Sequence, residues 1–123
     1  MAQHNDKGNE GERLAQRHLL EHGYAILETN WHLGKNEVDI IAYKEGIIVF
    51  VEVKTRTSAT FGNPQDFVTK EKQRAYIKMA DHYILNNNRT EEARFDIIAI
   101  VWTDKGYNLE HIESAFSAME LYR

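Results

Sequence analysis

The sequence has 123 residues, no cysteine and a formal net charge of −4 at pH 7. This length suits one domain with one hydrophobic core, so residues 1–123 are expected to form a single domain. Without cysteine the chain has neither disulfides nor thiolate zinc sites, which is typical of a reducing compartment. The acidic net charge excludes a uniformly basic nucleic-acid-binding domain.

The apolar runs of the chain are short. Runs such as residues 47–51 are far too short to cross a bilayer. The first residues, MAQHNDKGNEGER, are polar and no apolar run follows them, so we expect no signal peptide. These features predict a cytoplasmic protein without membrane contact.

The predicted elements follow the order helix, three strands, helix, two strands. Asp6 or Asn9 is the expected cap of a first helix that ends before Gly23, and Asn9 with Glu12 has capping-box spacing. Apolar patterns predict a second helix over residues 69–85, after a loop over residues 57–66. They predict strands over residues 24–32, 36–44, 47–55, 93–102 and 107–112. The expected fold class is α/β or α+β, with a mixed sheet flanked by helices and the order α-β-β-β-α-β-β.

The strands on either side of Glu45 and Gly46 can be aligned from their apolar patterns. A one-residue slip would move every side chain to the other face, and a loop of even length keeps one face wholly apolar. This register predicts an apolar face with the pairs Ala42–Val49, Ile40–Val51 and Val38–Val53. On the opposite face it predicts the pairs Ile41–Phe50, Asp39–Glu52 and Glu37–Lys54.

Asp39 and Glu52 would then be like charges directly opposite each other, an arrangement that destabilises an antiparallel pair. Two such carboxylates either share a proton or hold a cation, and hard oxygen ligands suit magnesium. Lys54 is expected to point into the same space, where it can orient a water or polarise a phosphate. The other interpretation is an exposed sheet face that carries a Glu37–Lys54 ion pair.

Glu12 falls on the same helical stripe as Ala15, on the inward side of the first helix. It is either a capping acid near Asn9 or a third acidic member of the site. His18 and His22 have i, i+4 spacing, but no third ligand accompanies them in the sequence. We interpret them as ordinary helix histidines.

Positive charge is concentrated between Lys54 and Lys78, where six basic and two acidic residues give +4 against −8 for the remainder. In the second helix, basic residues recur at every fourth position, namely Lys70, Arg74 and Lys78. This stripe predicts either a row of phosphate contacts or an ordinary solvated helix face.

An acid on the first helix, followed by EVDIIA and FVEVKTR, resembles the PD-(D/E)XK nuclease superfamily, which includes restriction endonucleases and archaeal Holliday-junction resolvases. The chain resembles more closely the small bacterial family often called YraN, which are predicted nucleases. The motifs that carry this resemblance span nearly the whole chain: GNEGE, HGYAILETN, EVDIIA, VFVEVKTR, FGNP, ARFDIIAI and HIESAF. His32 and the Lys35-Asn36 pair depart from the family pattern, which commonly has Arg and Gly at these places.

The resemblance implies a restriction-endonuclease-like fold and a role for each candidate residue. Asp39 would be the metal-binding Asp, Glu52 the second acid and Lys54 the catalytic Lys. Glu12 would be the helix-borne acid of the resolvase branch, and the backbone carbonyl of Val53 would complete the metal coordination. The implied cofactor is Mg²⁺ or Mn²⁺.

These features together predict a metal-dependent endonuclease that hydrolyses DNA, with branched or junction DNA as a candidate substrate. Arg56 and the second-helix stripe would bind flanking phosphates, and the loop over residues 57–66 would close over the strand. One alternative is a nucleic-acid-binding or accessory module with the same fold that does not cleave; another is a structural adaptor. The sequence leaves DNA and RNA both open, and a homodimer is implied by analogy with resolvases alone.

Overall fold

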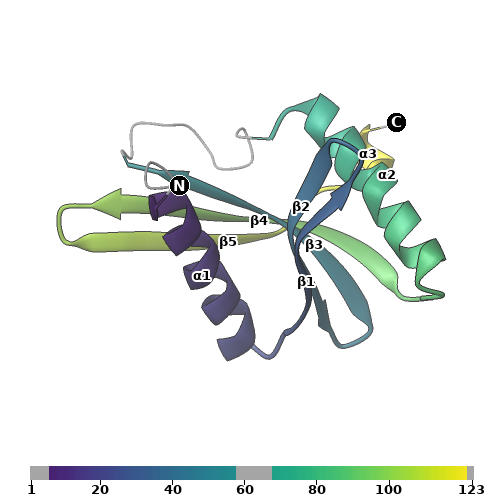
Figure 1. The fold of residues 1–123 in the computed structure, drawn as a ribbon, viewed down its shortest axis with the longest axis horizontal. Coiled ribbons are helices and arrows are strands. Elements are labelled where there is room, and N and C mark those ends of the chain that lie inside the picture. The colour runs from purple at the N-terminus through teal and green to yellow at the C-terminus, as the bar shows by residue number, and fades with distance from the viewer. Residues whose placement is uncertain (1–5, 58–67, 122–123) are drawn as a thin grey trace.

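The computed structural model describes residues 6–57 and 68–121, and it has the predicted mixed α+β fold (Figure 1). A short helix, α3, follows the last strand. The loop predicted over residues 57–66 lies outside the described residues apart from Thr57. The elements are α1 Asp6–Glu21, β1 Ala25–Leu33, β2 Asn36–Lys44, β3 Ile47–Arg56, α2 Lys70–Asn86, β4 Glu92–Thr103, β5 Gly106–Phe116 and α3 Ala118–Leu121.

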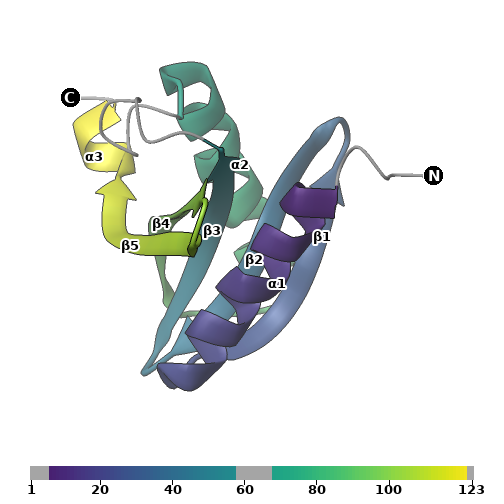
Figure 2. The same cartoon turned by 90° about the vertical axis from the view of Figure 1, so that its left-hand side faces the viewer.

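The five strands form one sheet in the order β1-β2-β3-β4-β5. β3 and β4 pair in parallel because the crossover that contains α2 runs between them, and the other neighbours pair antiparallel. Helices α1 and α2 lie on opposite faces of the sheet (Figures 1 and 2). Within the described part of the chain, no helix combines the length and apolar character that a membrane span requires.

The core has two layers, one on each face of the sheet, because side chains alternate along β3. Val49 and Val51 pack on the α1 side with Ala15. Ile48 and Phe50 pack on the α2 side. Both layers are needed to bury this strand, which explains its nearly continuous apolar sequence.

Backbone pairing between β2 and β3 confirms the even register for the pairs Lys44–Ile47, Tyr43–Ile48, Ala42–Val49, Ile41–Phe50 and Ile40–Val51. Glu45 and Gly46 both have positive φ, 52° and 84°, as a two-residue type I′ hairpin turn requires. The prediction that Val38 shares the face of Ile40 is wrong, since Val38 packs in the cluster on the α2 side. Pairing with β3 ends at Ile40, whereas Val38 still pairs with Trp31 of β1, so this end of β2 follows its other neighbour.

Gly11 lies where α1 approaches β3. A Cβ at this position would be 2.5 Å from Oγ1 of Thr55, and the β-branched Thr55 has little rotamer freedom with which to move aside. We therefore expect Gly11→Ala to lower the free energy of unfolding by about 1–3 kcal/mol through overpacking. Urea unfolding followed by circular dichroism measures this change.

Gly8→Ala is the matched control on the same helix. A Cβ at Gly8 would meet no heavy atom within 4 Å among the described residues. Alanine should then stabilise the helix by up to about 1 kcal/mol. Thr55→Ala in the Gly11→Ala background should recover part of the lost stability. If both glycine substitutions stabilised the protein equally, the close approach of α1 and β3 would be refuted.

Candidate active site

The predicted acidic pair lies where β2 and β3 separate. Asp39 is one residue beyond the last backbone pair, Ile40–Val51, and Glu52 is its counterpart on β3. In place of a further backbone pair, the N–H of Val53 donates to Oδ2 of Asp39 at 2.8 Å. Glu52 is only 3% exposed, so a buried carboxylate lies beside a half-buried one at this end of the sheet.

Three donors of the protein converge on Glu52. The hydroxyl of Tyr76 donates to Oε1 at 2.5 Å. The ammonium groups of Lys72 and Lys54 lie 2.8 Å and 3.2 Å from Oε2. Lys72 and Tyr76 are one turn apart on α2, so a single helix face delivers both. Lys54 follows Glu52 by two residues on β3 and therefore shares its side of the strand.

The electrostatics of this cluster are unusual for surface groups. Burial raises the pKa of Asp39 to about 7, and the nearby Glu52 adds to the rise, while the hydrogen bond from Val53 opposes it. Burial raises the pKa of Tyr76 well above its ordinary value, so its hydroxyl stays protonated and donates. For Lys72, burial lowers the pKa, but the contact with Glu52 outweighs this effect and the net pKa is raised. The cluster combines a carboxyl that resists ionisation with an ammonium that resists deprotonation.

Glu12 reaches this region from α1. The helix begins at Asp6, so the capping box predicted at Asn9 is wrong, because Asn9 lies inside the helix. Instead Nδ2 of Asn30 donates to Oε1 of Glu12 at 3.2 Å and to Oε2 of Glu37 at 2.6 Å. Burial raises the pKa of Glu12, and the Asn30 hydrogen bond opposes that rise. Glu12 therefore belongs to the acidic cluster and not to the end of its helix.

The interpretation of these acids as an exposed face with a Glu37–Lys54 pair is wrong. Lys54 contacts Glu52, whereas Glu37 contacts Asn30 and also His32, with 3.5 Å between Oε1 and the imidazole Nε2. The alternation of side chains along β3 puts Lys54 on the side of the strand that faces the acids. It pairs with Glu52, which is buried, and not with the more exposed Glu37. This is expected, because a charge is paired more strongly where water screens it less.

A cleft of about 280 Å³ lies beside the acids, between the turn that joins β1 to β2 and helix α2. Carboxylates and ammonium groups both line it: Glu37, Asp39, Lys35 and Lys72. Its other lining residues are Asn36, Ala75, Tyr76 and Met79. The cleft thus has room for a small group next to the acidic pair, where an anion would meet the ammonium groups of Lys35 and Lys72.

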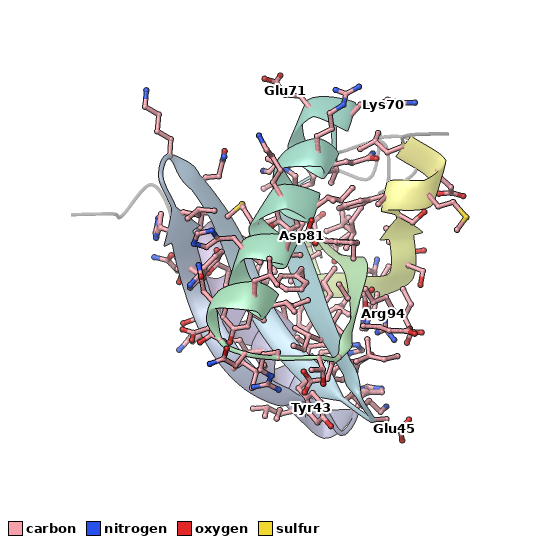
Figure 3. All side chains as sticks on the ribbon, turned by 90° about the vertical axis from the view of Figure 1, so that its right-hand side faces the viewer. Tyr43, Glu45, Lys70, Glu71, Asp81 and Arg94 are labelled. Atoms are coloured by element: carbon pink, nitrogen blue, oxygen red, sulfur yellow. The ribbon has the colours of Figure 1, made fainter. Side chains whose placement is uncertain are left out.

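The residues predicted to bind phosphate lie outside this cluster of contacts. Three of them are on the exposed face of α2: Lys70, Arg74 and Lys78. Figure 3 shows Lys70 at the first turn of α2, pointing away from the sheet. Arg56, at the end of β3, donates to the carbonyl of Thr55 at 2.9 Å. The structure therefore brings Asp39, Glu52 and Lys54 together, links Glu12 to Glu37 through Asn30 near this pair, and leaves the basic stripe on the surface.

The chemistry of the donor set fits a hard divalent cation. Asp39 and Glu52 offer carboxylate oxygens, which Mg²⁺ and Mn²⁺ prefer. Across residues 6–57 and 68–121, no three Asp, Glu, His or Cys side chains are arranged to hold a metal ion together. Two carboxylates, with waters and a substrate phosphate completing the shell, is a common way to bind Mg²⁺. The residues fit such an ion provided that Glu52 releases one of its protein donors.

The sequence patterns did not single out Lys72, Tyr76 or Asn30. Tyr76 belongs to the apolar stripe of the second helix. Lys72 lies one turn before it, at the border of that stripe. This border position is the one signal that could have drawn attention to them. Asn30 has a positive φ of 51°, a conformation that Asn tolerates, but its side-chain contacts had no sequence signal.

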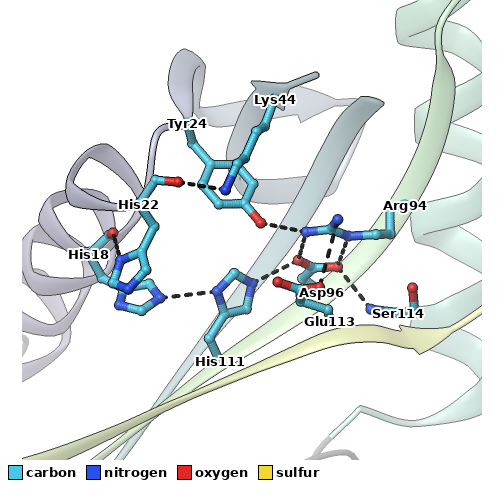
Figure 4. Close-up of polar contacts among 9 residues, drawn as sticks. All are labelled: His18, His22, Tyr24, Lys44, Arg94, Asp96, His111, Glu113 and Ser114. Carbon is cyan, nitrogen blue, oxygen red and sulfur yellow. Dashed lines mark hydrogen bonds and ion pairs between the residues drawn. The ribbon is translucent and has the colours of Figure 1, made fainter. Parts of the chain in front are cut away.

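A second polar cluster surrounds Asp96 of β4, which is fully buried (Figure 4). Arg94 donates from Nε to Oδ1 at 2.9 Å and from Nη2 to Oδ2 at 2.7 Å. Nε2 of His111 lies 2.7 Å from Oδ2, and the N–H of Ser114 donates to Oδ1 at 3.1 Å. All of these partners lie on β4 and β5, so the carboxylate joins the two strands where their register shifts.

The cluster extends from the sheet to α1. Nε2 of His18 lies 3.1 Å from Nδ1 of His111, and Nη2 of Arg94 donates to the hydroxyl of Tyr24 at 2.6 Å. Burial lowers the pKa of His18, and the neighbouring His111 lowers it further. His18 is therefore a packing contact between α1 and β5, which refines the interpretation of an ordinary helix histidine.

Comparison with known proteins reveals relatives over nearly the full chain. The model of the family described as "Uncharacterised protein family UPF0102" matches residues 11–100. A UPF0102 protein of Flavobacterium psychrophilum is 51% identical over 116 residues, which cover 94% of this chain and 98% of the relative. Similar proteins of Flavobacterium johnsoniae and Phocaeicola vulgatus are 47% and 44% identical, over 94% of this chain and 98% and 96% of their own. The matched segment contains every residue of the candidate site.

Proposed function

This chain belongs to the uncharacterised protein family UPF0102, and on that premise we propose that it is a metal-dependent phosphodiesterase that cleaves DNA. One observation carries the proposal: a buried Glu52 beside Asp39, with the ammonium of Lys54 3.2 Å from the glutamate. An acidic pair with an adjacent lysine is suited to holding a divalent ion against a phosphate. The proposal places the chain with the YraN-like members of the PD-(D/E)XK superfamily.

Each residue of the cluster has a role in this proposal. Asp39 and Glu52 would hold Mg²⁺ or Mn²⁺, with the carbonyl of Val53 as a further ligand. The bound ion would lower the pKa of a coordinated water and offset the charge of the phosphate. Lys54 would orient the water or a phosphate oxygen, and Glu12 would add negative charge beside the ion.

The surface residues would bind the DNA backbone by charge and without reading sequence. Arg56 would contact a phosphate next to the cleft, and the exposed stripe of α2 would contact phosphates further away. The members of that stripe are Lys70, Arg74 and Lys78. Such contacts release counterions, so binding should weaken steeply as the salt concentration rises.

The experiment that tests the proposal is a cleavage assay on labelled linear duplex, single-stranded and four-way-junction DNA, with an RNA arm beside them. Each substrate is incubated with Mg²⁺, Mn²⁺ or a chelator. We expect cutting with either metal and none with the chelator. Paired symmetric cuts in the junction would indicate a homodimer, because each protomer cuts one strand. Cutting that persists in chelator would overturn the metal-dependent mechanism.

One observation favours a second candidate, a nucleic-acid-binding module that does not cleave. Both oxygens of Glu52 are engaged by donors of the protein itself, Tyr76 on one and two lysines on the other. A module of this kind would show salt-dependent DNA binding in the same assay without cutting under any metal. Binding with no product therefore selects this alternative.

A further inference from the structure

The way in which Glu52 is held limits how a metal can reach it. Oε1 accepts from Tyr76 at 2.5 Å, and Oε2 faces both Lys72 at 2.8 Å and Lys54 at 3.2 Å. Lys72 donates a hydrogen bond to Oε2, and Lys54 forms an ion pair with the same oxygen. A metal ion at Oε2 would therefore lie beside two ammonium groups of like charge, and its binding favours the departure of one of them.

The three donors differ in their freedom to leave. Tyr76 is 1% exposed and packs against Phe116, with ring centroids 6.2 Å apart, so its hydroxyl is fixed by the core. The Lys54 side chain is 21% exposed and the Lys72 side chain is 41% exposed. Lys72 reaches Glu52 from α2 on a long flexible stem, whereas Lys54 lies on the same strand as Glu52. Lys72 is the donor that can move with least disturbance.

The cleft beside the acidic pair can take up the displaced Lys72 side chain. Lys72 lines this cleft of about 280 Å³ together with Lys35, beside Asp39. Positive charge beside a buried carboxylate offsets the cost of its burial, and besides Lys54 either the Lys72 ammonium or a metal ion can supply it to Glu52. An ammonium released into the cleft would be stabilised by an anionic group such as a phosphate.

We propose that Lys72 is an exchangeable counter-ion for Glu52: its ammonium and a divalent metal ion compete for Oε2, and the displaced ammonium contacts the substrate phosphate in the cleft. This inference rests on the proposed function, because it requires an ion at Glu52. It assigns different roles to the two lysines, since Lys54 stays at the carboxylate and Lys72 leaves it. Lys72 acts through Glu52 until the exchange takes place.

The proposal predicts that removing the Lys72 charge strengthens metal binding and raises the KM for DNA. Calorimetric titration with MnCl₂ in the absence of DNA should give a Kd about tenfold lower for Lys72→Met than for the wild type, that is about 1.4 kcal/mol. Lys72→Arg keeps the charge and should stay within about twofold of the wild type. With DNA, Lys72→Met should raise KM, because the released ammonium is missing.

Lys70→Met is the matched control, since it removes a lysine of the same helix that is exposed and two residues away. It corrects for the general effect of one fewer positive charge and should change the Mn²⁺ Kd by less than about twofold. Lys72→Gln serves as a second variant in case Lys72→Met does not fold, and circular dichroism checks each protein. Differential scanning calorimetry should show a larger Mn²⁺-induced rise in Tm for Lys72→Met and Lys72→Gln than for the wild type.

The outcomes separate this inference from the function on which it rests. Tighter Mn²⁺ binding by the neutral Lys72 variants, beyond the Lys70→Met control, supports the exchange. Equal or weaker binding by folded Lys72→Met and Lys72→Gln overturns the exchange and leaves the metal site standing. Failure of the wild type and of every variant to bind Mn²⁺ overturns both.

Discussion

Asp39→Asn should abolish metal-dependent cleavage and leave the protein folded. The asparagine Oδ1 can still accept the hydrogen bond that Val53 donates to Asp39 at 2.8 Å, so the local geometry of β2 and β3 is kept. What is lost is the charge that would hold the metal. A bound metal supplies several kcal/mol of transition-state stabilisation, so we expect the cleavage rate to fall by roughly 10³-fold. Initial rates with Mn²⁺ on the best DNA substrate measure this.

The stability of Asp39→Asn gives an independent check of the electrostatics. Burial and the nearby Glu52 raise the pKa of Asp39 to about 7. A raised carboxyl pKa means that the folded protein binds the proton more tightly than the unfolded chain, so this group lowers stability as the pH rises from about 4 to 7. Above pH 7, Asp39→Asn removes the unfavourable charge, and the metal-free variant should unfold at a urea concentration no lower than the wild type.

Asp81→Asn is the matched control, because Asp81 is an exposed carboxylate on α2 (Figure 3). It should alter neither the cleavage rate nor the urea midpoint. An Asp39→Asn protein that cleaves within about threefold of the wild type would remove Asp39 from the active site, since a metal ligand contributes far more than that. A variant that is inactive because it has unfolded would be recognised by its lowered midpoint.

The part of the candidate site that lies on β2 and β3 could be predicted from the sequence. Alternation along β2 and β3, together with the Glu45-Gly46 turn, determines the register, and the register brings Asp39 towards Glu52. These are contacts between neighbours in a hairpin, for which local periodicity is sufficient information. Val38 departs from this register, because there the strand pairs with β1 and no longer with β3.

The contacts made by α2 could not be predicted in the same way. Lys72 and Tyr76 meet Glu52 only because the helix crosses the sheet at one particular angle and height. Helical periodicity identifies the buried face, but it does not tell which residue of that face lies above which strand residue. Asp96 is a similar case: the sequence shows an Asp within the apolar run ARFDIIAI, but its partners His111 and Ser114 lie on a different strand, β5.

Asp96→Ala should cause the largest loss of stability of any substitution considered. The carboxylate is fully buried and has two contacts from Arg94, one from His111 and one from the N–H of Ser114. Removing it deprives the partly buried guanidinium of Arg94 of its two-bond partner and leaves the exposed Glu113, 3.9 Å away, as a weaker counter-charge. Breaking a buried ion pair in this way costs about 3–5 kcal/mol. Urea unfolding at pH 7, followed by circular dichroism, measures the difference.

The loss should depend on pH with a definite sign. Burial raises the pKa of Asp96, but the bonds from His111 and Arg94 lower it more, so the net pKa is below its usual 3.8. A depressed carboxyl pKa stabilises the folded state above pH 3.8, and this contribution is lost as the pH falls through the lowered value. The difference in unfolding free energy between wild type and Asp96→Ala should therefore be constant near neutrality and shrink below about pH 4.

Glu113→Gln is the control for this prediction, because Glu113 lies 3.9 Å from the same guanidinium of Arg94 but is 61% exposed. Exposed ion pairs contribute little, so this change should cost less than about 0.5 kcal/mol. The two carboxylates share one cation but differ in burial and in the number of their contacts, and both differences predict the contrast between them. Comparable losses for Asp96→Ala and Glu113→Gln would show that the Asp96 cluster is not what joins α1, β4 and β5.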